Sequence, residues 1–386
     1  MIDRYVLLTG GRNNAGDYLI KYRAKQLLSA LRPDRTIVDY DAWKLLTPEQ
    51  LEVINQSRAL LLTGGPSLQY RMRPSIYPMV EDLNRIRAPI IMMGIGWKSP
   101  DGSWESTHRY PLSPATLELL KRIDKTGYSS SVRDYHTANV LFHYGLKNVL
   151  MTGCPALYSL EHIGKASASL KDVKKVSVSL GASFVHNTGM EQAMKRLVLE
   201  LRERFKSQEM TVTFHHSLNR EQFVSTYNGN RVFLERHLTF ADWLRQRGIP
   251  YVDISGSEQK LIEHYSRCDL HVGYRVHAHI FMSSVSKPSI LINEDGRGRA
   301  LRDVTGGICL DGYTYSAGRP SLLGKVKSRL FGTASDSSLR PSLAASADVL
   351  SQIEYEIATG FPRIGQARGN IDRHFDVMRR FIAQLP

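Results

Sequence analysis

Residues 59–66 read ALLLTGGP, an apolar run that ends at two glycines and a proline. Two runs of the same kind flank it in the N-terminal half, YVLLTGG at residues 5–11 and PIIMMGIG at residues 89–96. Short apolar runs that end in glycine and lead into helical periodicity are typical of strands buried in a parallel sheet. The N-terminal half therefore predicts β-α-β units, whose ligands lie beyond the carboxyl ends of the strands.

The same alternation occurs a second time along the chain. Between Leu157 and Lys174 the pattern dissolves, and from Val176 onward strands and helices alternate again. We predict an α/β fold of two Rossmann-like domains whose parallel sheets face a cleft, in a glycosyltransferase-B-like arrangement. The predicted divisions are an N-terminal domain at 1–160, a linker at 161–173, a C-terminal domain at 174–346, and C-terminal helices at 347–386 that pack back on the N-terminal domain.

The composition is that of a folded protein that attracts anions. Its 386 residues include 51 Lys plus Arg against 37 Asp plus Glu, and the net charge of +14 favours phosphorylated metabolites, an anionic membrane face or nucleic acid. Nucleic acid is the least favoured, because no basic run is interleaved with aromatic residues. Cys154, Cys268 and Cys309 form no CxxC pair, and the first residues resemble a strand rather than a secretion signal. We expect a cytoplasmic protein without a transmembrane segment.

The segment 316–346 breaks the alternation. It is rich in Ser, Gly and Pro, and it carries five basic residues against one acidic residue. We interpret it as a mobile surface loop in preference to a basic amphipathic helix that contacts an anionic membrane. On the second interpretation the protein would be peripheral to the cytoplasmic membrane.

The first candidate site opens a helix after the first strand, at NNAGD in residues 13–17. Backbone N–H groups at a helix start attract anions, so Asn14 and Gly16 are substrate-binding candidates. Asp17 is either a functional carboxylate or a plain N-cap. Glycines that end two later strands are further binding candidates: Gly64, Gly65, Gly94 and Gly96. Tight strand-to-helix turns alone would also account for those four glycines.

The second candidate is Arg133 in SVRD, residues 131–134, where a strand ends and a helix begins. Asp134 suits the N-cap of that helix. An arginine at the carboxyl end of a central strand points toward the cleft, and its planar guanidinium suits a carboxylate or phosphate. A salt bridge across the domain interface is an equally open interpretation.

The third candidate is DLHVGYRVHAH at residues 269–279, a strand and a glycine turn followed by a helix. Arg275 and His277 fall in its first turn and suit a phosphorylated substrate, with Arg275 supplying charge and His277 a proton near neutral pH. His277 and His279 are not expected to share a metal, because residues two apart point to different faces of a helix. No metal is therefore expected. His215, which follows another strand, is a weaker candidate for lining the cleft.

Several segments in order resemble the polysaccharide pyruvyl transferase family: NNAGDYLI, LLTGGPSL, MGIGW, SVRDYHTANVL, TGCPAL, VSVSLGAS and YRVHAHIFMSSVSKPSILINEDGR. The resemblance implies a glycosyltransferase-B-like fold and transfer of a pyruvyl group from phosphoenolpyruvate to sugar hydroxyls. The acceptor it implies is a cell-surface polysaccharide or a lipid-linked precursor, and no cofactor is required beyond the donor. Arg133 matches the arginine of the family's S-x-R-D motif. Arg275 and His277 match its R-x-H motif, so the resemblance implies donor binding and catalysis for them.

Two positions depart from the family pattern. Cys154 stands where family members commonly have Asp in a TG-D-P-A motif, and Arg297 stands where they often have lysine. Arginine can hold a phosphate, but it stays charged and is a poor proton donor. If the lysine supplies charge, little is lost; if it transfers a proton, this chain is an altered member.

On this resemblance we predict a role for each candidate residue. Arg133, Arg275 and Arg297 would bind the carboxylate and phosphate of the donor. His277 would act as the acid that protonates the methylene carbon, while Asp17 would position or deprotonate the acceptor hydroxyl.

Two other functions remain open on the sequence alone. The same fold houses glycosyltransferases that use nucleotide sugars, for which Glu294 or Asp295 could recognise the donor. A non-catalytic binding member of the family is the other alternative. The sequence leaves open the acceptor sugar, the stereochemistry of the ketal and the oligomeric state.

Overall fold

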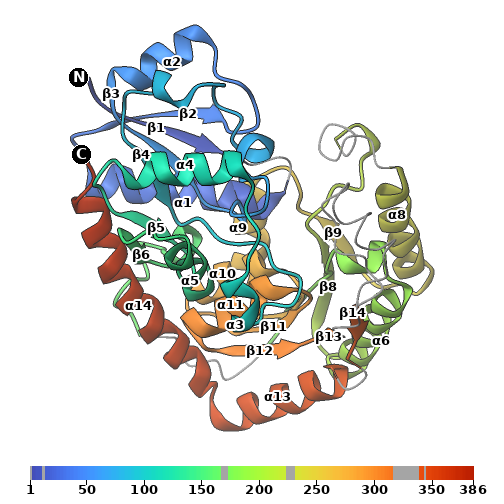
Figure 1. The fold of residues 1–386 in the computed structure, drawn as a ribbon. Coiled ribbons are helices and arrows are strands. Elements are labelled where there is room, and N and C mark those ends of the chain that lie inside the picture. The colour runs from blue at the N-terminus through green and yellow to red at the C-terminus, as the bar shows by residue number, and fades with distance from the viewer. Residues whose placement is uncertain (1, 11–13, 167–172, 223–230, 316–338, 343–344) are drawn as a thin grey trace.

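The computed structural model describes residues 2–10, 14–166, 173–222, 231–315, 339–342 and 345–386. Two parallel sheets form the framework, each with helices packed against it (Figure 1). The predicted fold class, two Rossmann-like domains with parallel sheets, is confirmed. Part of the predicted linker and most of the predicted basic loop lie outside the described residues.

The N-terminal sheet has four parallel strands in the order β2-β1-β3-β4. Their bounds are β1 Ile2–Thr9, β2 Thr36–Asp41, β3 Ser57–Thr63 and β4 Ile90–Met93. The parallel pair β5 Ser130–Val132 and β6 Val149–Met151 lies beside β4, where the Gly94 amide donates to the Ser131 carbonyl at 2.9 Å. Helices between these strands are α1 Ala15–Leu31, α2 Pro48–Asn55, η1 Met72–Ile76, η2 Leu83–Arg85, α3 Trp104–His108, α4 Pro114–Asp124 and α5 Tyr135–His143, and η3 Pro155–Leu157 follows β6.

The C-terminal sheet has six parallel strands in the order β12-β11-β10-β7-β8-β9. The strands are β7 Lys175–Ser179, β8 Glu209–Phe214, β9 Tyr251–Asp253, β10 Leu270–Gly273, β11 Ser289–Asn293 and β12 Ile308–Asp311. The helices are η4 Ser183–Val185, α6 Thr188–Arg204, α8 Arg231–Gln246, α9 Glu258–Ser266, α10 Val276–Ser284 and α11 Gly296–Thr305. A short antiparallel pair, β13 Tyr313–Tyr315 and β14 Leu339–Pro341, lies outside this sheet.

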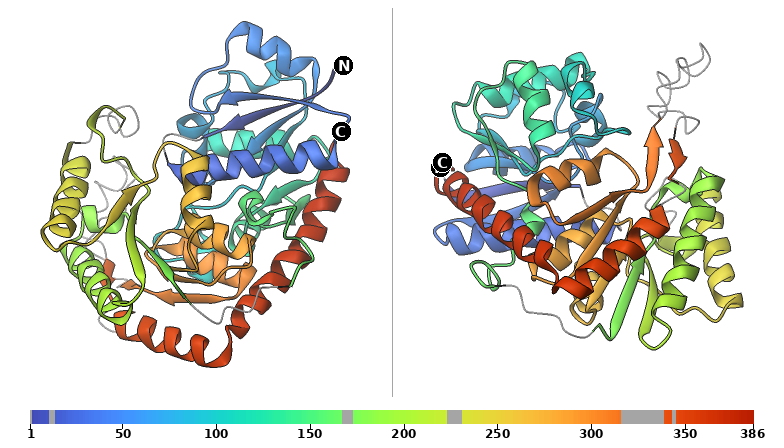
Figure 2. Two further views of the ribbon diagram at one scale, coloured as in Figure 1. Left: turned by 180° about the vertical axis from the view of Figure 1, so that it is seen from behind. Right: turned by 90° about the horizontal axis from the view of Figure 1, so that it is seen from below.

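The last two helices return the chain to its beginning. From α13 Ala345–Thr359, on the C-terminal domain, α14 Pro362–Ala383 runs back to the N-terminal domain (Figure 2). There the Tyr5 hydroxyl donates to the Pro386 carbonyl at 2.8 Å, and Arg32 Nη1 donates to the Leu385 carbonyl at 2.7 Å. Within the described residues, no helix is both long enough and apolar enough to cross a membrane.

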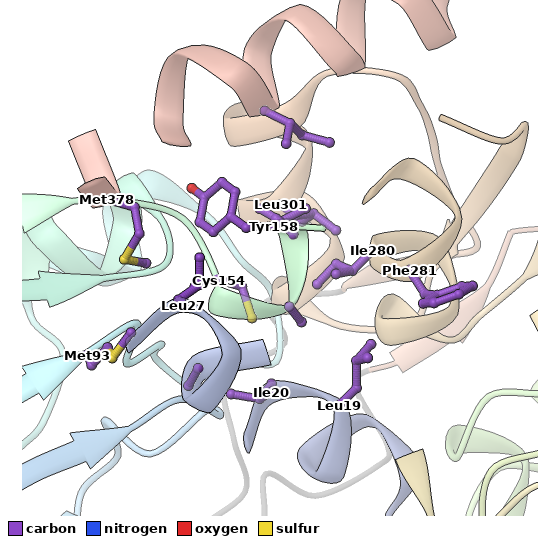
Figure 3. Close-up of a cluster of buried hydrophobic side chains, with 14 of the residues drawn as sticks. Leu19, Ile20, Leu27, Met93, Cys154, Tyr158, Ile280, Phe281, Leu301 and Met378 are labelled. Carbon is purple, nitrogen blue, oxygen red and sulfur yellow. The ribbon is translucent and has the colours of Figure 1, made fainter. Parts of the chain in front are cut away.

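One hydrophobic core joins the two domains. Leu19 and Leu27 of α1 lie in the same buried cluster as Ile280 and Phe281 of α10 (Figure 3). Cys154 also belongs to this cluster, and burial raises the pKa of its thiol to about 11. The thiol is therefore neutral and packed as an apolar group. Because apolar burial crosses the junction, residues that the two domains contribute to one site are held in a fixed relation.

Candidate active site

The predicted catalytic residues meet where the start of α1, from the N-terminal domain, faces the start of α10, from the C-terminal domain. Arg275 is the N-cap residue of α10, and His277 lies in its first turn. Gly16 lies in the first turn of α1 and contacts the His277 ring, since an added Cβ at Gly16 would come 2.1 Å from His277 Nδ1. The two helix starts are thus in van der Waals contact across the domain junction.

His277 is buried, with 8% of its surface exposed, and its Nε2 atom has no hydrogen-bond partner among the described residues. Burial lowers the pKa of His277 to about 3, and the positive charges of three arginines add to the effect: Arg133, Arg297 and Arg275. The imidazole is therefore neutral at physiological pH, which differs from the expectation that a protonated His277 supplies the proton near neutral pH. A buried ring nitrogen without a partner is poised to bond to a ligand.

The close contact at Gly16 leads to a prediction. Gly16→Ala places a methyl group against the imidazole, and overpacking of this kind costs about 1–3 kcal/mol of unfolding free energy. Gly369→Ala in α14 is the matched control, because an added Cβ there meets no heavy atom within 4 Å. Denaturant unfolding should show a loss of stability for the first variant and none for the second. Equal stability of the two variants would contradict the contact.

Asn14 and Asp17 complete the start of α1. The Asn14 side chain accepts from the Gly16 amide at 3.1 Å, so Asn14 is the N-cap and the alternative that Asp17 is the cap is wrong. Burial raises the pKa of Asp17 to about 6, although the positive charges of Arg297 and Arg133 oppose the rise. Asp17 thus lies close enough to both arginines to interact with them electrostatically, and its pKa is near neutral pH.

Arg133 lies directly after β5 and is 7% exposed. Its guanidinium packs over Gly96, where an added Cβ would come 1.9 Å from Arg133 Nε. Arg133 Nε lies 3.4 Å from Asp134 Oδ2, and Asp134 is the N-cap of α5. The predicted capping role of Asp134 is confirmed, and the carboxylate that faces Arg133 comes from its own domain rather than from across the interface.

Arg275 is held by the loop after β7. Its Nε donates to the Leu180 carbonyl at 2.6 Å, and its Nη2 donates to the Gly181 carbonyl at 3.2 Å. The amides that follow, Ala182 N and Ser183 N, donate to Glu294 Oε2 at 2.7 and 2.9 Å. The buried Glu294 carboxylate therefore holds the loop that positions Arg275.

Arg297 is held by a carboxylate of its own helix start. Asp295 is the N-cap of α11, and Arg297 Nε and Nη2 donate to its Oδ2 at 2.9 and 2.6 Å. The charge of Asp295 raises the pKa of Arg297 above its ordinary value. Glu294 and Asp295, the two acidic residues that could have recognised a nucleotide, are thus engaged within the protein.

The remaining predicted residues lie around this junction or behind it. An added side chain at Gly64 would meet Ile20, and one at Gly94 would meet Pro155, so these glycines make close packing contacts. An added Cβ at Gly65 would come 3.6 Å from the Ser67 hydroxyl, an ordinary contact. His215 is 1% exposed and bonds to the Tyr265 hydroxyl at 2.7 Å, so it lies in the interior instead of lining a cleft.

Among the described residues, features outside the junction give no second candidate centre. A cavity of about 460 Å³ lies beside α9, lined among others by Lys175, Glu209 and His264, and no predicted site residue borders it. The described residues contain no group of three or more His, Cys, Asp or Glu side chains that could hold a metal ion.

Two features of the junction were missed by sequence analysis. The role of Glu294 in holding the 180–183 loop depends on a contact between residues far apart in the chain, and no local pattern signals it. Lys98, close enough to Arg297 and Asp295 to feel their charges, was also missed. Its position directly after the glycine-rich turn MGIGW could have indicated it.

Comparison with known proteins identifies one family. A family model described as polysaccharide pyruvyl transferase matches residues 14–296, and no curated protein matches the chain. Among solved structures, UDP-GlcNAc 2-epimerase from Neisseria meningitidis aligns at 10% identity with a TM-score of 0.43, over 91% of this chain and 100% of that chain. The Methanocaldococcus jannaschii UDP-GlcNAc 2-epimerase aligns at 10% identity with a TM-score of 0.46, over 91% of this chain and 99% of that chain. The wall teichoic acid polymerase TagF aligns at 11% identity with a TM-score of 0.42, over 99% of this chain and 89% of that chain.

Proposed function

The chain belongs to the polysaccharide pyruvyl transferase family, and on that premise we propose that it transfers a pyruvyl group from phosphoenolpyruvate to two hydroxyls of a sugar. The product is a cyclic pyruvate ketal on a cell-surface polysaccharide or its precursor. The net charge of +14 suits an acceptor carried on a lipid at the cytoplasmic face of an anionic membrane. The proposal requires no cofactor beyond the donor.

The observation that carries the proposal is the meeting of three arginines with a neutral, unpartnered imidazole. Arg133, Arg275 and Arg297 all act on the pKa of His277, so their charges converge on one buried ring. Phosphoenolpyruvate carries a carboxylate and a phosphate group on the same carbon, C2, and planar guanidinium groups suit both. Each arginine is fixed by its own partner, so the cations are preorganised before the donor binds.

In the first step the oxygen of a sugar hydroxyl forms a bond to C2 of the donor while C3 gains a proton. The neutral His277 imidazole suits this step, because Nε2 can accept the hydroxyl proton and deliver it to the methylene carbon. No proton is gained from or lost to solvent. The intermediate is a tetrahedral ketal phosphate.

In the second step the bond between C2 and the phosphate oxygen breaks, and the second hydroxyl attacks C2. The arginines stabilise the charge on the departing phosphate. The proton of the second hydroxyl passes to the phosphate, and Asp17 is the group we assign to accept it on the way. Two hydroxyl protons thus end on the new methyl group and on the released phosphate.

The role of Asp17 gives a pH prediction. Its carboxylate must be ionised to accept a proton, and its pKa is raised to about 6, so kcat/KM should fall as the pH drops through about 6. Asp17→Asn should lower the rate and remove this acid limb. An acid limb that persists unchanged in Asp17→Asn would belong to the donor's own ionisation, and it would exclude Asp17 from this role.

The function itself is tested with both substrates. The protein is incubated with phosphoenolpyruvate and a bacterial exopolysaccharide from which pyruvate ketals have been removed by mild acid. We expect release of inorganic phosphate that depends on the acceptor, together with a ketal methyl signal in the proton NMR spectrum of the polysaccharide. Transfer of a sugar from a nucleotide donor, with no phosphate released from phosphoenolpyruvate, would overturn the proposal.

A further inference from the structure

The loop after β4 bridges the two domains next to the candidate site. The Ser99 carbonyl accepts from the Gly296 amide at 3.0 Å, and the Asp101 carbonyl accepts from Arg299 Nη1 at 2.6 Å. The Tyr313 hydroxyl donates to the carbonyls of Pro100 and Asp101 at 3.1 Å each. The loop is therefore fastened to the start of α11 by main-chain and side-chain bonds.

This fastening places Lys98 opposite Arg297. Lys98 directly precedes Ser99, and Gly296 directly precedes Arg297, so the bond between Ser99 and Gly296 sets the two cationic residues across from each other. The main chain of Lys98 is fixed as well, because its amide donates to the Leu68 carbonyl at 3.1 Å and its carbonyl accepts from the Tyr110 hydroxyl at 2.7 Å.

The side chain of Lys98, by contrast, keeps contact with solvent, and none of the described residues bonds to its ammonium. Within the part of the chain that the structure describes, its ammonium makes neither a hydrogen bond nor an ion pair. The three arginines of the site differ in this respect, since carbonyl or carboxylate groups of the protein bond to each of them: Arg133, Arg275 and Arg297. Lys98 is thus a cation at this junction whose donors are all available to a ligand.

The electrostatics of Lys98 favour an anionic ligand. Partial burial of the Lys98 side chain and the positive charge of Arg297 both lower the pKa of its ammonium, and Asp295 offsets this only in part. A cation placed beside another cation is relieved when an anion binds between them. A flexible lysine suits a phosphate group as a point charge, and it would add to the fixed arginines, which suit both the carboxylate and the phosphate.

We propose that Lys98 is a substrate-contacting residue of this site, whose ammonium binds the phosphate group of the donor from the side opposite Arg297. The identity of that donor as phosphoenolpyruvate rests on the proposed function. The chemistry that Lys98 recognises, a phosphate group, does not.

The test is calorimetric titration of phosphoenolpyruvate, and separately of inorganic phosphate, into four proteins. They are the wild type, Lys98→Met, Lys98→Arg and the control Lys206→Met. The control changes an exposed lysine just after α6 that is paired with Glu203. We expect Lys98→Met to weaken phosphoenolpyruvate binding by about tenfold or more, as for a charge-assisted hydrogen bond. Lys98→Arg should stay within a few fold of the wild type, and Lys206→Met should match it.

A pH series separates a charge contact from a structural role. Affinity in the wild type should fall at alkaline pH, as Lys98 loses its proton below the ordinary pKa of lysine, and Lys98→Arg should remove this fall. The other titratable groups that face Lys98 keep their protonation state over this alkaline range. Asp295 raises the pKa of Arg297, burial raises the pKa of the Tyr110 hydroxyl, and Arg297, against the effect of burial, lowers the pKa of Asp295.

Each outcome supports or overturns the role of Lys98 in phosphate binding. If the wild type binds phosphoenolpyruvate and Lys98→Met binds it equally well, the inference is overturned while the proposed function stands. If the wild type does not bind phosphoenolpyruvate, the proposed function fails, and the phosphate titration then decides on Lys98 alone. Weaker phosphate binding in Lys98→Met supports the contact, and equal or absent phosphate binding in both proteins refutes it.

Discussion

Replacing His277 by asparagine is expected to lower the turnover of pyruvyl transfer by about 100- to 10,000-fold, the usual contribution of a positioned proton-transfer group. Asparagine has similar bulk and can still form hydrogen bonds, but it cannot accept a proton and deliver it to carbon. Donor binding depends on the arginines and should remain within a few fold of the wild type. The measurement is single-turnover phosphate release from phosphoenolpyruvate in the presence of acceptor, alongside donor affinity by calorimetry.

His279→Asn is the matched control for this experiment. His279 lies two residues further along α10, is also buried, and bonds through Nδ1 to the Ser289 hydroxyl at 2.8 Å. Its replacement should lower the stability and leave turnover close to that of the wild type. Full turnover in His277→Asn would remove His277 from proton transfer, whatever its effect on stability.

Arg133→Ala is expected to weaken phosphoenolpyruvate binding by about 10- to 100-fold, the range for loss of a hydrogen bond between charged groups. Arg133 is buried after β5, and Gly96 leaves the room through which its guanidinium reaches the junction. Arg133→Lys keeps the charge but loses the planar pair of donors, so its affinity should fall between those of the wild type and the alanine variant. Calorimetry measures all three affinities.

A buried arginine away from the site separates binding from folding. Arg368 on α14 is 3% exposed, and it donates to the Ser284 carbonyl at 3.1 Å and to Asp372 at 2.6 Å. Arg368→Ala should reduce the melting temperature without changing the affinity for phosphoenolpyruvate. If Arg133→Ala and Arg368→Ala alter affinity to the same small extent, Arg133 has no direct contact with the donor.

The parts of this structure that could be predicted from sequence are those with a local signature. The run ALLLTGGP and its counterparts indicate parallel strands because the apolar residues form the buried strand and the glycines form the turn that ends it. The rule that ligands lie at the carboxyl ends of such strands was enough to select Arg133, Arg275, His277 and the start of α1. The structure brings these residues together at one junction.

The parts that could not be predicted depend on the direction of single side chains and on contacts between distant residues. His215 follows a strand end as Arg133 does, yet its side chain turns inward to Tyr265, and the sequence does not specify that direction. Asn14 rather than Asp17 caps α1, although both residues suit the position. The bonds of Glu294 to Ala182 and Ser183 join segments more than a hundred residues apart.

The most direct test of the central claim is a calorimetric titration of the purified protein with phosphoenolpyruvate, beside Arg275→Ala and a panel of nucleotide sugars. The account predicts saturable binding of phosphoenolpyruvate by the wild type, loss of that binding in Arg275→Ala, and no binding of the nucleotide sugars. Binding of a uridine or guanosine diphosphate sugar without binding of phosphoenolpyruvate would contradict it and would indicate glycosyl transfer instead.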